Sequence, residues 1–122
     1  MVEFALVLPI LLMLVLGMIQ YGWYFYVSET ASGAASNVTR RLSVGDCWPG
    51  TQAYDYARKQ SPKVTGVTKS PTDLSVAAAG DLLAVTVTAD ANMFGLFPLP
   101  DDGIVTRVVN ARLEDTTAGP SC

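Results

Sequence analysis

The chain has 122 residues, no histidine and a formal net charge of −3, from 8 Lys and Arg against 11 Asp and Glu. This acidic balance provides no basic surface for nucleic acid. Without histidine there is no Ser–His or Cys–His pair for nucleophilic catalysis, and no glycine-rich phosphate loop precedes a helix. We therefore predict a protein that is not an enzyme, needs no cofactor or metal, and does not bind nucleic acid.

The first feature along the chain is an uncharged apolar run over residues 4–27, with Glu3 directly before it. About 24 residues at ~1.5 Å each make ~36 Å of helix, enough to cross a hydrocarbon core of ~30 Å. The run ends in aromatic residues, and Tyr and Trp favour the lipid headgroup level. We predict a transmembrane helix over residues 1–27, with membrane-interface aromatics Tyr21, Trp23, Tyr24 and Tyr26.

Two alternatives compete with this interpretation. The aromatic residues would suit the core of a soluble domain, but no polar face accompanies them. A cleaved secretory signal needs a basic start, a shorter apolar core and a small-residue cleavage site. The stretch ASGAAS at residues 31–36 meets only the last requirement. Within the run, Pro9 is expected to kink or locally melt the helix, because it lacks an N–H and crowds the preceding turn.

The helix is predicted to continue beyond the membrane. Over residues 28–44 the apolar residues recur at spacings of three and four, which is the period of one helix face. This stripe consists of Val27, Ala31, Ala34, Val38 and Leu42. We expect one helix of roughly 40 residues, half in lipid and half lying on a domain. Gly45 is the expected C-cap, and Pro49-Gly50 follows as a breaker.

Residues 45–122 are predicted to form an extracellular αβ head. Residues 51–60 suggest a short helix capped by Thr51 and stopped by Ser61-Pro62. The stretches KVTGVT, DLSVAA, LLAVTVTA and IVTRVVNARLE are rich in Val and Thr and suggest antiparallel strands. The facing of the last strand stays open, because Val108 and Val109 point opposite ways. The predicted fold class is α+β, with the long N-terminal helix packed on a small antiparallel sheet.

Two further features of the head concern contacts. Cys47 and Cys122 are the two cysteines; their spacing does not suit zinc, and in an oxidising compartment they would form one disulfide. The alternative is two unrelated thiols. Residues 90–103 are too apolar for a solvated loop, because they contain Met93, Phe94, Leu96 and Phe97. Either this loop covers the sheet edge as core, or it docks a partner or the membrane surface.

The sequence Asp101-Asp102-Gly103 ends this loop. Its carboxylates could suggest calcium, but no ligand spacing accompanies them. Asp and Gly are common turn residues, so we predict a turn here.

The N-terminal sequence VEFALVLPILLMLVLGMIQYGWYFYV resembles the signature of TadE-like minor pilins, or pseudopilins, of tight-adherence (Flp-type) type IV pili. The resemblance covers residues 2 to about 35 and includes Glu3, Pro9, the leucine-rich run and the aromatic exit. It implies a pilin-like fold, a role in pilus assembly at or near the tip, and a Glu3 that neutralises the N-terminal amine of a neighbouring subunit. The other interpretation of Glu3 is an acid at the helix start, stabilised by the macrodipole.

In that family the glutamate follows a prepilin-peptidase cleavage point, after a glycine, by a few residues. Glu3 comes slightly earlier here, which leaves the mature N-terminus open. The resemblance implies a single-pass protein of the inner (cytoplasmic) membrane with its head outside, later part of an extracellular pilus. Its partners would be other pilin or minor pilin subunits and the membrane. The alternative is an anchored extracellular binding domain that never enters a filament.

Overall fold

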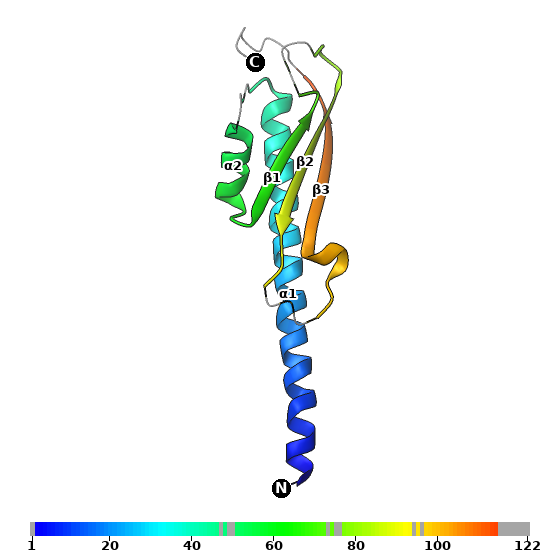
Figure 1. The fold of residues 1–122 in the computed structure, drawn as a ribbon. Coiled ribbons are helices and arrows are strands. Elements are labelled where there is room, and N and C mark those ends of the chain that lie inside the picture. Colours follow the sequence, from blue (N-terminus) through cyan, green and yellow to red (C-terminus); the bar gives the residue numbers. More distant parts are fainter. Residues whose placement is uncertain are drawn as a thin grey trace.

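The computed structural model describes residues 2–46, 48, 51–72, 74, 77–93, 95 and 97–114. Its elements are α1 (Val2–Ser43), α2 (Gln52–Gln60), β1 (Val64–Ser70), β2 (Leu82–Asp90), the 3-10 segment η2 (Pro100–Gly103) and β3 (Ile104–Arg112). α1 is a long rod, and the other elements pack along its C-terminal half (Figure 1). The predicted α+β, pilin-like fold is confirmed.

α1 is one continuous helix, so the local melting that was one of the two expectations at Pro9 does not occur. The helix passes through Pro9 without interruption. A proline removes one backbone donor, but the remaining bonds of a long helix hold its geometry on both sides.

α1 ends at Ser43 and is followed closely by Gly45, which has a φ of 94°. Its N–H donates to the Leu42 carbonyl at 3.3 Å, and the Asp46 N–H donates to the Arg41 carbonyl at 3.1 Å. This pair of bonds is a Schellman motif, in which glycine accepts the left-handed conformation.

The sheet has the order β1-β2-β3, and both pairs are antiparallel. In β2 the inward residues Leu83, Val85 and Val87 are buried, as the alternation predicts. The register sets Val109 opposite Val85, so Val109 packs against the core while Val108 is exposed. Long-range pairing therefore decides the facing that the sequence of β3 left open.

One predicted strand is wrong. Within DLSVAA, the described residues Leu74, Ala77 and Ala78 are not in a strand. The Ala77 N–H instead donates to the Leu74 carbonyl at 3.3 Å, which closes a local turn. Leu74 and Ala77 are nevertheless buried. An apolar stretch of this length can supply core side chains from a turn as well as from a strand, and its sequence does not separate the two.

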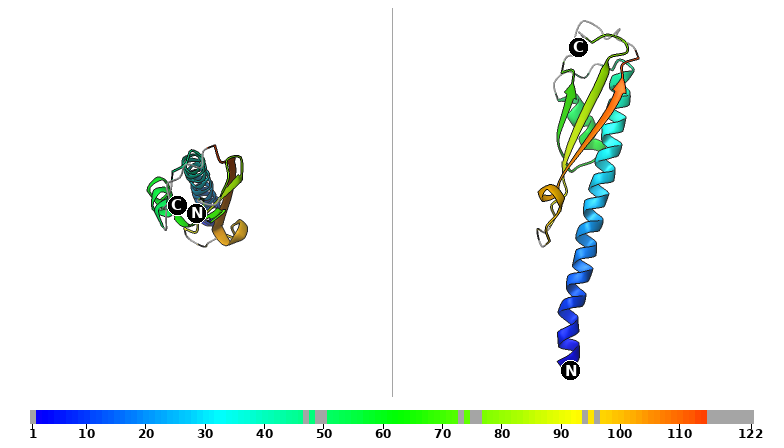
Figure 2. Two further views of the ribbon diagram at one scale, coloured as in Figure 1. Left: turned by 90° about the horizontal axis from the view of Figure 1, so that it is seen from above. Right: turned by 90° about the vertical axis from the view of Figure 1, so that its right-hand side faces the viewer.

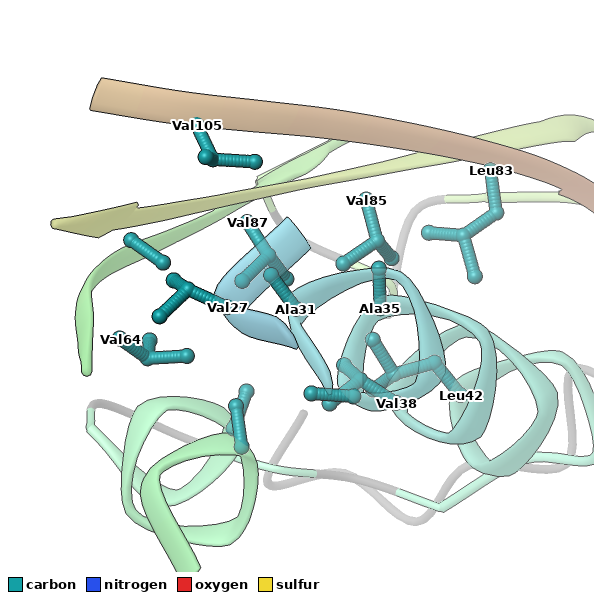
Figure 3. Close-up of a cluster of buried hydrophobic side chains, with 14 of the residues drawn as sticks. Val27, Ala31, Ala35, Val38, Leu42, Val64, Leu83, Val85, Val87 and Val105 are labelled. Carbon is teal, nitrogen blue, oxygen red and sulfur yellow. The ribbon is translucent and has the colours of Figure 1, made fainter. Parts of the chain in front are cut away.

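The core lies between α1 and the inner face of the sheet (Figure 3). The predicted stripe of α1 forms one side of it, and all of its residues are buried. The alanines in this stripe have no bulk beyond Cβ, so the helix axis can lie close to the strands. Larger side chains fill the space between layers: Leu42, Val38, Leu83, Val85 and Val87.

α2 packs beside α1 and buries Ala53 and Ala57. It begins after Thr51 as predicted, but the Thr51 side chain makes no capping hydrogen bond. Its φ of −94° and ψ of 3° differ from the extended geometry that directs a cap side chain at the helix start. Side-chain bonds join the helices instead: Asn37 Nδ2 donates to Gln60 Oε1 at 2.8 Å.

Two neighbouring leucines of β2 test the packing. Leu83 is 0% exposed and Leu82 is 62% exposed. We expect Leu83→Ala to lower the free energy of unfolding by ~2–5 kcal/mol, because it opens a cavity between α1 and the sheet. The matched Leu82→Ala change should stay within ~0.5 kcal/mol. Denaturant unfolding of the full chain in detergent measures both, and equal effects would contradict the sheet facing.

Candidate membrane and assembly segment

The N-terminal part of α1 projects beyond the head, and its residues 3–16 are bare (Figure 2). Every residue from Glu3 to Leu16 is exposed, and almost all of them are apolar. By length and composition, α1 is the one helix in the described residues that can cross a membrane. An apolar surface this extensive and contiguous requires a covering of lipid or protein. The structure is thus consistent with a membrane anchor or a pilin helix.

Glu3 lies in the first turn of α1, at the end farthest from the head (Figure 1). Its side chain is exposed, and among the described residues it forms no ion pair. A carboxylate here meets the positive end of the helix macrodipole. This position also leaves its oxygens accessible to a cation from another molecule. Both interpretations of Glu3 from the sequence therefore remain available.

The four predicted interface aromatics divide into two pairs. Tyr21 and Tyr26 are exposed, as a residue at the headgroup level would be. Trp23 and Tyr24 are partly buried and pack against the head core. Lys63 Nζ lies 5.9 Å from the centre of the Trp23 ring. The second pair thus also fixes the head to α1, which the sequence pattern did not indicate.

A short segment of the loop after β2 returns to α1. We call residues 97–99 the strap. Gln20 of α1 is 1% exposed and binds the strap twice. Its Nε2 donates to the Phe97 carbonyl at 2.9 Å, and its Oε1 accepts from the Phe97 N–H at 3.2 Å. One side-chain amide therefore pairs both main-chain groups of one residue.

Two further contacts fix the strap on the same helix face. A Cβ added at Gly17 would lie 3.9 Å from Cε2 of Phe97, so the ring lies directly over this glycine. The Tyr21 hydroxyl donates to the Pro98 carbonyl at 3.3 Å. Positions 17, 20 and 21 are neighbours at helical spacing. Phe97 thus packs on α1, below the sheet, and not over the sheet edge.

The other loop residues of the candidate docking set are placed only in part. Met93 is 47% exposed, and it leaves an apolar side chain free for contact. Phe94 and Leu96 lie outside the described residues. The docking role of the loop stays a prediction. Sequence reasoning missed Gln20, although a lone amide inside an apolar run is a signal that could have identified it.

The turn expected at the end of the loop is present. Asp101 and Asp102 have φ values of 50° and 53°, and Gly103 has 79°. The Ala91 N–H donates to the Gly103 carbonyl at 2.8 Å, which ties the two ends of the loop together. Three successive left-handed residues reverse the chain from the strap into β3. In the part of the chain that the structure describes, no three potential metal ligands gather in one place.

The predicted disulfide falls on Cys47 and Cys122, which both lie outside the described residues. The nearest described segments do meet, because the Glu114 N–H donates to the Ser43 carbonyl at 2.9 Å. The described residues nearest to the two cysteines therefore lie close together, at the C-terminal end of α1.

The bare part of α1 lies within a segment that matches a known protein family. Residues 1–40 match the family model described as TadE-like protein. This N-terminal segment is similar to TadE-like proteins. The TadE-like match ends inside α1 and covers the bare part together with most of the stripe. It suggests a pilus-associated protein linked to the Tad pilus machinery. Searches of curated proteins and of solved structures found no match.

The strap contact can be tested at Gln20. Gln20→Leu removes the partners of the Phe97 N–H and C=O, and each buried unpaired group costs about 1–3 kcal/mol. We expect faster amide hydrogen exchange at Phe97 and a lower stability of the full chain in detergent. Gln52→Leu is the matched control, because Gln52 is exposed at the start of α2. Unchanged exchange at Phe97 would show that other contacts hold the strap.

Proposed function

We propose that this chain is a minor pilin that takes part, without catalysis, in assembling a tight-adherence type IV pilus, at or near its tip. The observation that supports this most is the division of α1. Residues 3–16 are exposed and almost all apolar, the second half of α1 carries a folded head, and the TadE-like match extends over both. The tip position follows the family resemblance.

In this proposal α1 has two successive surroundings. The chain first lies in the inner membrane as a single-pass protein, with the head on the extracytoplasmic side. It then passes into the extracellular filament, where the helices of neighbouring pilin subunits replace lipid. Lipid tails and leucine-rich helix faces are about equally apolar, so the hydrophobic effect opposes this exchange little. A polar contact must then help to set the position of the subunit.

Glu3 is the residue proposed to make that contact. We expect it to pair with the N-terminal amine of a neighbouring subunit. A buried carboxylate without a partner is strongly unfavourable, and so is an amine left unpaired by its removal. In the membrane alone, Glu3 can stay at the interface and needs no partner.

Glu3→Ala should therefore leave expression and membrane insertion intact and reduce incorporation into filaments. The measurement is the ratio of this protein in sheared, purified pili to that in membranes. Glu29→Ala is the matched control, because Glu29 is exposed on the head half of α1. Equal incorporation of the Glu3 variant and the wild type would contradict the pairing role. Wild-type protein found in membranes and never in sheared filaments would instead favour the anchored extracellular binding domain.

The disulfide between Cys47 and Cys122 is the second part of the proposal that can be tested. Ser43 and Glu114 are hydrogen-bonded, and eight extended residues span up to ~26 Å, so Cys122 can reach Cys47 from Glu114. Mass spectrometry of a non-reduced digest of protein from its native compartment should find the two peptides linked. Free thiols at both positions would reject the bridge and weaken the extracytoplasmic assignment of the head.

A further inference from the structure

The strap lies lower along α1 than the rest of the head. It contacts Gly17, Gln20 and Tyr21, whereas the packed core begins at Val27. A hydrocarbon core of ~30 Å takes about 20 helical residues, so a span that starts at Glu3 reaches roughly residue 23. The strap is therefore beside helix positions within the outer edge of that span.

The composition of the strap suits this level. Phe97, Pro98 and Leu99 carry no charge. The first charged residues after them, Asp101 and Asp102, belong to η2, which lies nearer the sheet (Figure 1). Two cations of the head meet α1 beyond the strap contacts: Lys63 lies over Trp23, and the Arg107 guanidinium donates to the Ser28 hydroxyl. The apolar strap is thus followed by the two aspartates of η2, and cations of the head also lie beyond it, so charge begins only above the level of the strap.

The main-chain groups of Phe97 and Pro98 have partners on α1, which exposure to water alone would not require. Phe97 has both of its groups bound by Gln20, and the Pro98 carbonyl accepts from Tyr21. Pro98 has no N–H to satisfy. In water such groups can bind solvent, but in hydrocarbon each unpaired one costs several kcal/mol. Non-helical backbone at membrane depth is tolerated only when its polar groups have protein partners.

We propose that the strap is inserted into the outer interfacial layer of the lipid bilayer, beside α1, with Gln20 pairing its main chain. This inference depends on the proposed membrane insertion of α1. Its consequence is that α1 and the head enter the bilayer surface as one body. The depth of α1 in the bilayer is then set at the strap: the strap enters the lipid, and the sheet and η2 above it stay outside.

The test uses the full chain in phospholipid nanodiscs, with ¹⁵N on phenylalanine alone. The sequence has four phenylalanines, so only four amide signals arise, and single Phe→Leu variants assign them. One sample contains lipid with a nitroxide close to its ester groups, and another contains a water-soluble gadolinium chelate. Phe4 reports on insertion of α1, Phe25 on the headgroup level and Phe97 on the strap.

If the proposal holds, the lipid nitroxide removes most of the signal of Phe4 and Phe97, and the gadolinium chelate leaves both largely intact. A Phe97 signal lost only to the chelate, with Phe4 lost to the nitroxide, would overturn the strap proposal and leave membrane insertion standing. A Phe97 signal that resists both reagents would also overturn it, in favour of a protein covering. A Phe4 signal that resists the nitroxide would instead contradict the proposed insertion itself.

Discussion

The packing of one stripe of α1 on the inner face of a three-stranded sheet is the contact on which the rest of this structure depends. Three strands with one apolar face are near the minimum for an independently stable sheet, and that face must be covered. The helix supplies the second layer, and its alanines let the strands come close. Because the same helix continues for about 25 residues past this contact, the head and the bare apolar segment share one hydrogen-bonded rod. Movement of one must be transmitted to the other.

The strap extends that contact toward the bare part. Gln20 is a polar group in an apolar segment, and such a group is costly unless it is paired. The structure pairs it with a residue 77 positions away in sequence, and each side removes the desolvation cost of the other. The pairing depends on the side chain of Gln20, because an apolar residue at position 20 would leave the main-chain groups of Phe97 unpaired. It also fixes where along α1 the head ends.

The proposed role in pilus assembly combines a non-specific surface with a few specific groups. The bare part of α1 has no pattern that distinguishes lipid from another leucine-rich helix. Glu3 at its end and the strap near residue 20 are the features that can set position along the axis. In the proposed role, the chain needs only to exchange lipid for neighbouring helices around α1.

The sequence by itself determined the elements whose signals are local. The uncharged run predicted a long apolar helix, and the spacing of three and four predicted its buried stripe. Alternation predicted the inner face of β2, and Gly45 predicted where α1 stops. Tertiary structure decided whatever depends on what covers a residue. The apolar stretch DLSVAA contributes Leu74 and Ala77 to the core from a turn. Val109 faces inward because of its register with Val85, and Trp23 packs against the core of the head. The Gln20–Phe97 pair joins two segments with no shared local pattern. Periodicity indicates which face of an element is apolar. Which other segment buries that face depends on packing between parts of the chain that are far apart in sequence.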